Sequence, residues 1–218
     1  MQADFSIECG PDDERLEIPW ASEDGLLAYC DLKRNPDLIQ QLVEVRQYPE
    51  LEEFLRAANS AASVFQTAKC DAWFTTEIAP EEEIFEKSGK FGSYVDVVFE
   101  SSDARVSFAA HELEVKSLVG LLRGEPEMPA SVEFLVRRCF FHDRDEQDGF
   151  YITCYVFGYG NDETEARRNW GFALRQVGKV FCSERDSSPS QRTLRVRNDK
   201  KEKQLRPCCS RCPARARH

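Results

Sequence analysis

The sequence predicts an α+β fold in a single domain over residues 1–183. Its antiparallel sheet would be built from two strand–strand–helix units, with the helices packed on one face. Runs rich in β-branched and aromatic residues occur in two successive pairs, and an amphipathic helical pattern follows each pair. A pair of helices precedes the first unit. The alternative is a helix-grip-like fold, in which a curved sheet surrounds the C-terminal helix.

The first 60 residues combine short extended runs with the helix pair. Residues 4–9 are expected to form an edge strand, residues 16–20 a short extended run, and residues 25–31 a further strand. The two helices are expected to start at Asn35-Pro36 and at Tyr48-Pro49, because proline is well accommodated in a first helical turn. Both carry plain apolar stripes and no candidate chemistry.

The first unit spans residues 64–122. Its strands are predicted at 64–78 and 91–99, with an acidic loop between them. Ser107 is placed to cap a helix that Gly124 and the prolines after it would end. His111 falls on the apolar stripe of this helix, where a core histidine is more common than a metal ligand.

The second unit spans residues 132–181. Strands are predicted at 132–141 and 150–157, and Gly158-Tyr159-Gly160 is interpreted as a turn. Asp162 and Glu165 form a capping-box pattern at the start of the last helix. Seven apolar residues then recur on one stripe of that helix: Ala166, Trp170, Ala173, Leu174, Val177, Val180 and Phe181. Because both units share this order and a similar pattern, our hypothesis is that they arose by duplication of one unit.

The charge of the chain divides at residue 183. Residues 184–218 hold eleven Lys or Arg and four Asp or Glu, which is a net charge of +7. Since the whole chain carries −10, the first 183 residues carry −17. We expect the C-terminal part to be a basic, Cys-containing, disordered tail. The acidic body would repel nucleic acid and anionic membranes, which leaves nucleic-acid binding to the tail.

The composition also indicates the compartment. There is no apolar run long enough to span a membrane and no signal-peptide pattern at the N-terminus, so we expect a cytoplasmic protein. In a reducing compartment the nine cysteines are most simply small hydrophobic residues, several of them within predicted strands.

We find no motif for catalysis, cofactor binding or metal binding that meets its full requirements. Gly158 and Gly160 lack the third glycine of a dinucleotide loop, and acidic residues follow them. His142 and Asp143 are adjacent, so on a strand they face opposite ways. Cys209 and Cys212 are the metal-ligand candidates, but a zinc site requires two spaced ligand pairs. We therefore expect a protein that has no cofactor and is not an enzyme.

Aromatic residues supply the remaining candidates. Seven aromatic residues of the strands and the last helix are mostly core residues by their spacing, and some of them could line a ligand pocket between the sheet and the last helix. Phe140 and Phe157 are two of these seven. The pocket candidates are Trp73, Tyr94, Tyr151, Tyr155 and Trp170. The favoured function is a protein-interaction module that uses its acidic surface to bind a basic protein or a second copy. The alternative is a small-molecule binding protein or enzyme with an aromatic-lined cavity under the C-terminal helix.

Overall fold

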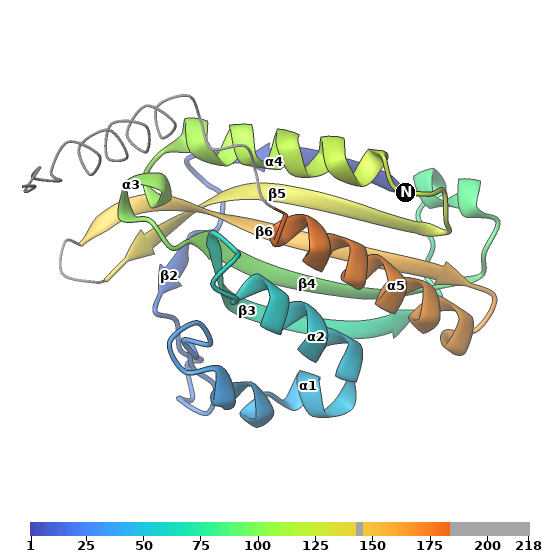
Figure 1. Ribbon diagram of the computed structural model, residues 1–218, viewed down its shortest axis with the longest axis horizontal. Coiled ribbons are helices and arrows are strands. Elements are labelled where there is room, and N and C mark those ends of the chain that lie inside the picture. The colour runs from blue at the N-terminus through green and yellow to red at the C-terminus, as the bar shows by residue number, and fades with distance from the viewer. Residues whose placement is uncertain (143–145, 184–218) are drawn as a thin grey trace, which may run out of the picture. The chain divides into compact units, whose positions relative to one another are not determined.

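The computed structural model describes residues 1–142 and 146–183 (Figure 1). The expected basic tail over 184–218, with Cys209 and Cys212, lies outside the described residues. The described chain has mixed α+β content, with one open sheet of six strands. In chain order its elements are β1 (Gln2–Glu8), β2 (Leu16–Ile18), η1 (Pro36–Gln41), α1 (Val43–Gln47), α2 (Pro49–Ala58), β3 (Phe65–Thr75), η2 (Pro80–Phe85), β4 (Gly89–Phe99), α3 (Ser102–Arg105), α4 (Phe108–Arg123), β5 (Ala130–Phe141), β6 (Gln147–Gly160) and α5 (Glu163–Phe181).

The strand order is β1-β5-β6-β4-β3, and β2 pairs with β5 beyond β1. The β5–β6, β6–β4 and β4–β3 pairs are antiparallel. By contrast, β1 and β2 both pair with β5 in parallel. The sheet is therefore mixed, and the prediction of a purely antiparallel sheet is wrong at this edge. A hairpin turn fixes the relative direction only of successive strands, and no such turn joins β1 to β5.

The long crossover of the fold runs from β4 to β5. These strands point the same way because each is antiparallel to β6, which lies between them. α4 makes the connection, so β4-α4-β5 is a split βαβ arrangement. α2, α4 and α5 lie on the same side of the sheet (Figure 1). The helix-grip alternative is not confirmed by this arrangement.

The predicted caps of the two long helices are present. The side chain of Ser107 accepts a hydrogen bond from the Ala110 amide at the start of α4. The side chain of Asp162 accepts one from the Glu165 amide at the start of α5. The Glu165 carboxylate accepts from the amide of Asn161, one residue before the cap, rather than from Asp162 itself. Both helices thus begin at the residues that the sequence indicates.

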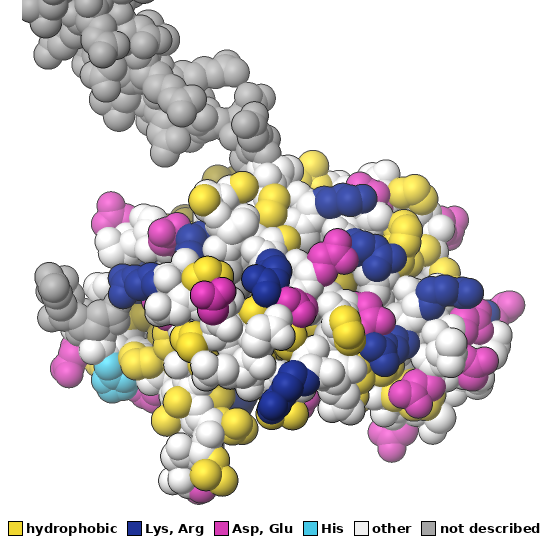
Figure 2. Space-filling view, turned by 60° about the horizontal axis from the view of Figure 1, so that its bottom comes forward, with side chains coloured by type: hydrophobic (Ala, Val, Ile, Leu, Met, Phe, Trp, Pro, Cys, Tyr) yellow, Lys and Arg dark blue, Asp and Glu magenta, His cyan; other side chains and the backbone are white. Residues whose placement is uncertain are grey.

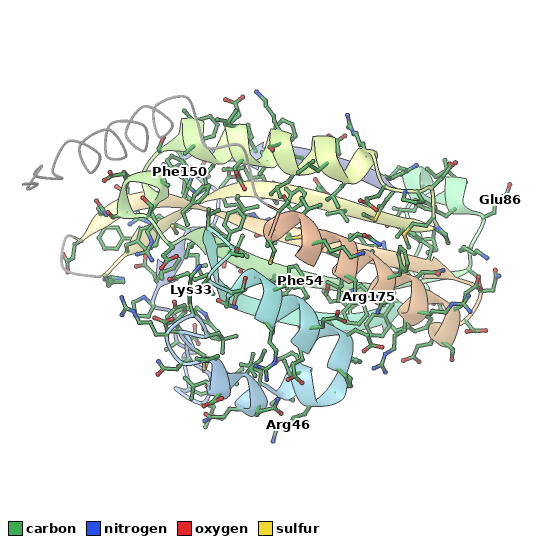
Figure 3. All side chains as sticks on the ribbon, in the orientation of Figure 1. Lys33, Arg46, Phe54, Glu86, Phe150 and Arg175 are labelled. Atoms are coloured by element: carbon green, nitrogen blue, oxygen red, sulfur yellow. The ribbon has the colours of Figure 1, made fainter. Side chains whose placement is uncertain are left out.

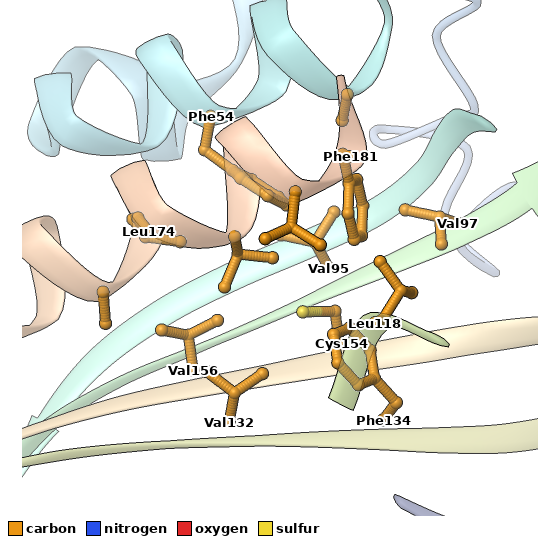
Figure 4. Close-up of a cluster of buried hydrophobic side chains, with 14 of the residues drawn as sticks. Phe54, Val95, Val97, Leu118, Val132, Phe134, Cys154, Val156, Leu174 and Phe181 are labelled. Carbon is orange, nitrogen blue, oxygen red and sulfur yellow. The ribbon is translucent and has the colours of Figure 1, made fainter. Parts of the chain in front are cut away.

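The hydrophobic core lies between the helices and the sheet (Figure 4). All seven predicted stripe residues of α5 are buried, and Trp170, Ala173, Leu174 and Val177 are fully inaccessible. They pack on alternate residues of the central strands, including Val95, Cys154 and Val156. Phe54 of α2 joins the same layer, with its ring centroid 5.5 Å from that of Phe181. α2 and α5 therefore share one continuous core.

Gly158 and Gly160 belong to β6, so the turn predicted there is wrong. Both residues face α5, where its backbone comes closest to the strand. A Cβ atom on Gly158 would collide with the backbone of Trp170, and one on Gly160 with the backbone of Ala166. The glycines therefore allow a close helix–strand contact rather than a change of direction.

The N-terminal region differs from the sequence prediction in two places. Residues 25–31 form no strand, because Gly25 lies in a turn at φ +69° and a single bridge joins Ala21 to Ala28. The first expected helix divides into η1 and the short α1. Lys33 lies beside the start of β3 (Figure 3), where its Nζ donates to the carbonyls of Ser63 and Phe65.

Every helix of the described residues is too short or too polar to cross a lipid bilayer.

Candidate functional site

The sheet face turned away from the helices carries four aromatic side chains in its middle. The register places Trp73 of β3 and Phe157 of β6 on either side of Gly92 of β4. It likewise places Tyr94 of β4 directly beside Tyr155 of β6. All four aromatic side chains are partly exposed. We call Trp73, Tyr94, Tyr155 and Phe157 the aromatic array.

The rings of the array are in mutual contact. Centroid distances are 6.4 Å for Trp73–Tyr94, 6.3 Å for Tyr94–Tyr155 and 6.2 Å for Tyr155–Phe157. Trp73 meets Phe157 edge-on, with centroids 6.3 Å apart and planes at 79°. A Cβ atom on Gly92 would press on both rings, at 2.8 Å from Phe157 and 3.2 Å from Trp73. Glycine at this position therefore lets the two rings close over β4.

The array occupies the gap between two covered ends of the same face. At one end β2 covers the sheet, and Ile18 packs in a small core with Val98, Cys139, Phe141 and Tyr151. At the other end η2 folds over the sheet. There Phe85 stacks on Tyr159, with centroids 4.1 Å apart and planes at 16°. Among residues 1–142 and 146–183, the covering segments therefore leave the middle of this face open.

Two open grooves meet at Phe157. One, of about 700 Å³, is lined by Trp73, Glu77, Lys90 and Phe157 among others. The second, of about 590 Å³, continues from Phe157 past Glu133 to Asp4. Together they run along η2 and across β3, β4, β6, β5 and β1. We call this combined surface the groove.

The charged side chains of the groove are mostly acidic. Its lining includes five carboxylates, Asp4, Glu77, Glu81, Glu82 and Glu133, and two basic side chains, Lys90 and Arg123. Lys90 is paired with Glu82 at 2.5 Å, and Arg123 lies 3.6 Å from Asp4. Burial acts to raise the pKa of Glu82, but hydrogen bonds from Lys90, the Ala79 amide and Tyr159 outweigh it and lower that pKa. Glu82 therefore stays ionised.

The negative charge of the body is not concentrated on the side shown in Figure 2. There, basic and acidic side chains are interspersed over the surface. On α5, for example, Arg167 forms a two-point ion pair with Glu50. The excess of carboxylates in the groove therefore contrasts with the mixed charges of that side.

The structure separates the five predicted pocket residues. Trp73, Tyr94 and Tyr155 lie together in the aromatic array. Tyr151 is on the same sheet face, but it is buried under β2. Trp170 is on the opposite side of the sheet, where its indole donates to Ser93 at 2.8 Å and its ring lies 4.6 Å from that of Phe91.

Of the four residues in the aromatic array, Phe157 is the one that is not among the pocket candidates predicted from the sequence. It stands two residues after Tyr155 on the same strand, so the two-residue period of a strand places both on one face. That period was the signal that could have added it to the candidates.

The cysteine and histidine candidates lie outside the lining of the groove. Burial raises the pKa of the Cys139 and Cys154 thiols, so both stay protonated. His142 pairs with Glu17 at the exposed end of β5. Within residues 1–142 and 146–183, no group of three His, Cys, Asp or Glu residues is placed to hold a metal ion.

The chain matches no protein-family model, no curated protein and no solved structure.

Proposed function

We propose that this chain is a non-catalytic protein-interaction module whose contact surface is the groove together with the adjoining aromatic array. The observation that carries the proposal is the position of the array, partly exposed at the centre of a sheet face whose two ends are covered. Aromatic side chains are enriched in the centres of protein interfaces, where they supply large contact areas at a small entropic cost.

A polypeptide partner suits the chemistry of this surface better than a nucleic acid does. Aromatic rings on a sheet can stack on bases, but such surfaces also carry basic residues that contact the phosphates. Here Asp71 flanks the array on β3 and Glu133 lines the groove on β5, so a phosphate backbone would be repelled. Both carboxylates are compatible with the amide and basic groups of a polypeptide.

The small-molecule alternative locates its ligand between the sheet and α5. In that layer the described side chains are tightly packed, and Trp170, Leu174 and Phe91 are essentially inaccessible to solvent. The observations thus favour the opposite sheet face, where the groove is open, as the contact surface.

Site-specific photocrosslinking tests the proposal. A photoreactive phenylalanine analogue replaces Phe157 in one variant and Leu113 in another, because Leu113 is 72% exposed on α4, across the sheet. In extract from the source cells, we expect the Phe157 variant to form a discrete adduct with a polypeptide and the Leu113 variant to form none.

The unlabelled chain should suppress the adduct, whereas the same chain with Tyr155→Ser should suppress it less. Equal adducts at both positions, or no adduct at Phe157, would refute the proposal.

We also propose that β3-β4-α4 and β5-β6-α5 derive from one duplicated ββα unit. Both strand pairs are antiparallel, and β4 lies beside β6 at the centre of the sheet. A two-fold axis between β4 and β6 would exchange the pairs. Superposition of the two units in an experimental structure tests this idea, which fails if the helices do not coincide.

A further inference from the structure

We infer that the groove binds an extended basic segment of its partner, laid across the strands, with an Arg or Lys side chain over the ring of Trp73 and a second one near Glu133. This inference rests on the proposed function and specifies the class of partner. It favours a basic segment over a second copy of the chain.

The dimensions of the groove suit an extended chain. Its lining residues include Trp73 on β3, Lys90 on β4, Phe157 on β6, Glu133 on β5 and Asp4 on β1. Five neighbouring strands have four spacings of about 4.8 Å, or about 19 Å in total. An extended chain advances about 3.3 Å per residue, so roughly six residues of a partner would cross the sheet.

The charges of the groove indicate which side chains such a segment presents. Lys90 and Arg123 engage Glu82 and Asp4. In the described part of the chain, Glu77, Glu81 and Glu133 form no ion pair. Glu133 accepts a hydrogen bond from Ser6 but remains exposed. These three carboxylates are therefore available to a cation from a partner.

The floor of the groove already holds one cation against an aromatic ring. The Lys90 ammonium lies 5.1 Å from the ring centroid of Phe157. Trp73, whose side chain contacts this ring, is partly exposed, and an indole is the aromatic group that attracts cations most strongly. A guanidinium over Trp73 would lie beside Glu77, which lines the same part of the groove.

The same charges disfavour a second copy. In a face-to-face dimer each groove would bring five carboxylates and only two basic side chains to the interface. Like charges would then oppose one another across a two-fold axis. A basic segment instead neutralises the excess negative charge of the groove.

Binding of synthetic octapeptides to the full chain tests the inference. The probes alternate Ser with Arg, Lys, Gln or Glu, and fluorescence anisotropy gives each Kd at two salt concentrations. We expect the Arg and Lys peptides to bind, with an affinity that falls as salt rises, and the Gln and Glu peptides to bind at least tenfold more weakly.

Two variants locate the site, and a third is the control. We expect Trp73→Leu and Glu133→Gln to weaken Arg-peptide binding by about three- to tenfold. Glu112→Gln removes a carboxylate on α4, where it pairs with Lys116, and should leave binding unchanged. Because Glu133 is exposed, its variant is informative even if Trp73→Leu fails to fold.

Some outcomes would refute the inference while leaving the proposed function intact. Equal binding of Arg and Gln peptides is one, and equal weakening by Glu112→Gln and Glu133→Gln is another, since it would indicate attraction to the acidic body as a whole. A crosslinked partner at Phe157 with no basic segment would have the same meaning. If the groove binds no peptide and Phe157 forms no adduct, both proposals fail.

Discussion

The hydroxyl of Thr153 donates a 2.7 Å hydrogen bond to Oδ1 of Asp96, its register partner on the neighbouring strand. Both side chains lie on the sheet face that bears the aromatic array, yet Asp96 is only 6% exposed and Thr153 1%. Burial raises the pKa of Asp96 to about 6, while the Thr153 hydrogen bond, Lys69 and Arg137 oppose the rise. The protein therefore contains a carboxyl group that takes up a proton at a higher pH than an ordinary aspartate does.

This carboxyl group should make stability fall as pH rises from about 4 to about 6. The folded pKa lies above the ordinary aspartate value of 3.8, so the folded state binds more protons than the unfolded state in this window. The side chain of Asp96→Asn still has an oxygen that can accept the hydrogen bond from Thr153, but the amide cannot ionise. We expect the unfolding free energy of the variant, minus that of the wild type, to rise across the window by on the order of 3 kcal/mol.

Denaturant titrations of both proteins at each pH measure this difference, and the comparison cancels the contributions of the other carboxylates. A difference that stays flat or falls between pH 4 and pH 7 would contradict the prediction. Thr153→Val removes the hydrogen bond that favours the ionised form of Asp96, so it should raise the pKa of this carboxyl group. The loss of stability should then occur at a higher pH.

The sequence predicted best those elements whose pattern is local. The α5 stripe from Ala166 to Phe181 is buried at every predicted position, and the caps at Ser107 and Asp162 are present. Each depends on residues within a few turns of one helix, so the chemistry of the segment decides it. The strand pattern likewise located β3, β4, β5 and β6 within a few residues.

What the sequence could not supply depends on distant contacts. The two-residue period groups Tyr155 with Phe157, but it does not say which sheet face the helices cover. The sequence pattern therefore places the pocket under α5, but of the five candidates only Trp170 lies there. The local sequence predicts a turn at Gly158, because the approach of α5 that explains this glycine is a distant contact.

Gly158→Ala should destabilise the protein by at least about 2 kcal/mol. Its Cβ would collide with the backbone of Ala166 and Trp170, which cannot move without shifting α5. The matched control is Gly120→Ala in the interior of α4, where a Cβ would meet no atom within 4 Å. This control should stabilise the protein by about 0.5–1 kcal/mol, because alanine is the better helix former. Thermal and denaturant unfolding measure both, and equal effects would refute the proposed close contact.

Ser93→Ala should cost about 1–3 kcal/mol, because it leaves the buried indole N–H of Trp170 without its acceptor. Trp170→Phe removes the donor and some packing. The double variant should cost less than the sum of the two single variants, since neither polar partner then remains buried alone. Chemical denaturation of the four proteins gives the coupling energy, and strict additivity would show that the hydrogen bond contributes nothing.

Lys33→Met should destabilise the protein by about 1–3 kcal/mol while preserving most of the apolar stem. The Nζ of Lys33 donates to the carbonyls of Ser63 and Phe65 at 2.6 and 2.8 Å and pairs with Glu100 at 3.0 Å. Its side chain is only 11% exposed, so water cannot readily replace these contacts. Amide hydrogen exchange at the start of β3 should accelerate together with the loss of stability.

Lys116→Met is the control, because Lys116 makes one exposed ion pair with Glu112 on α4. Such pairs contribute little, so its unfolding free energy should change by less than about 0.5 kcal/mol. If both substitutions had the same small effect, the Lys33 contacts would not stabilise the edge of the sheet.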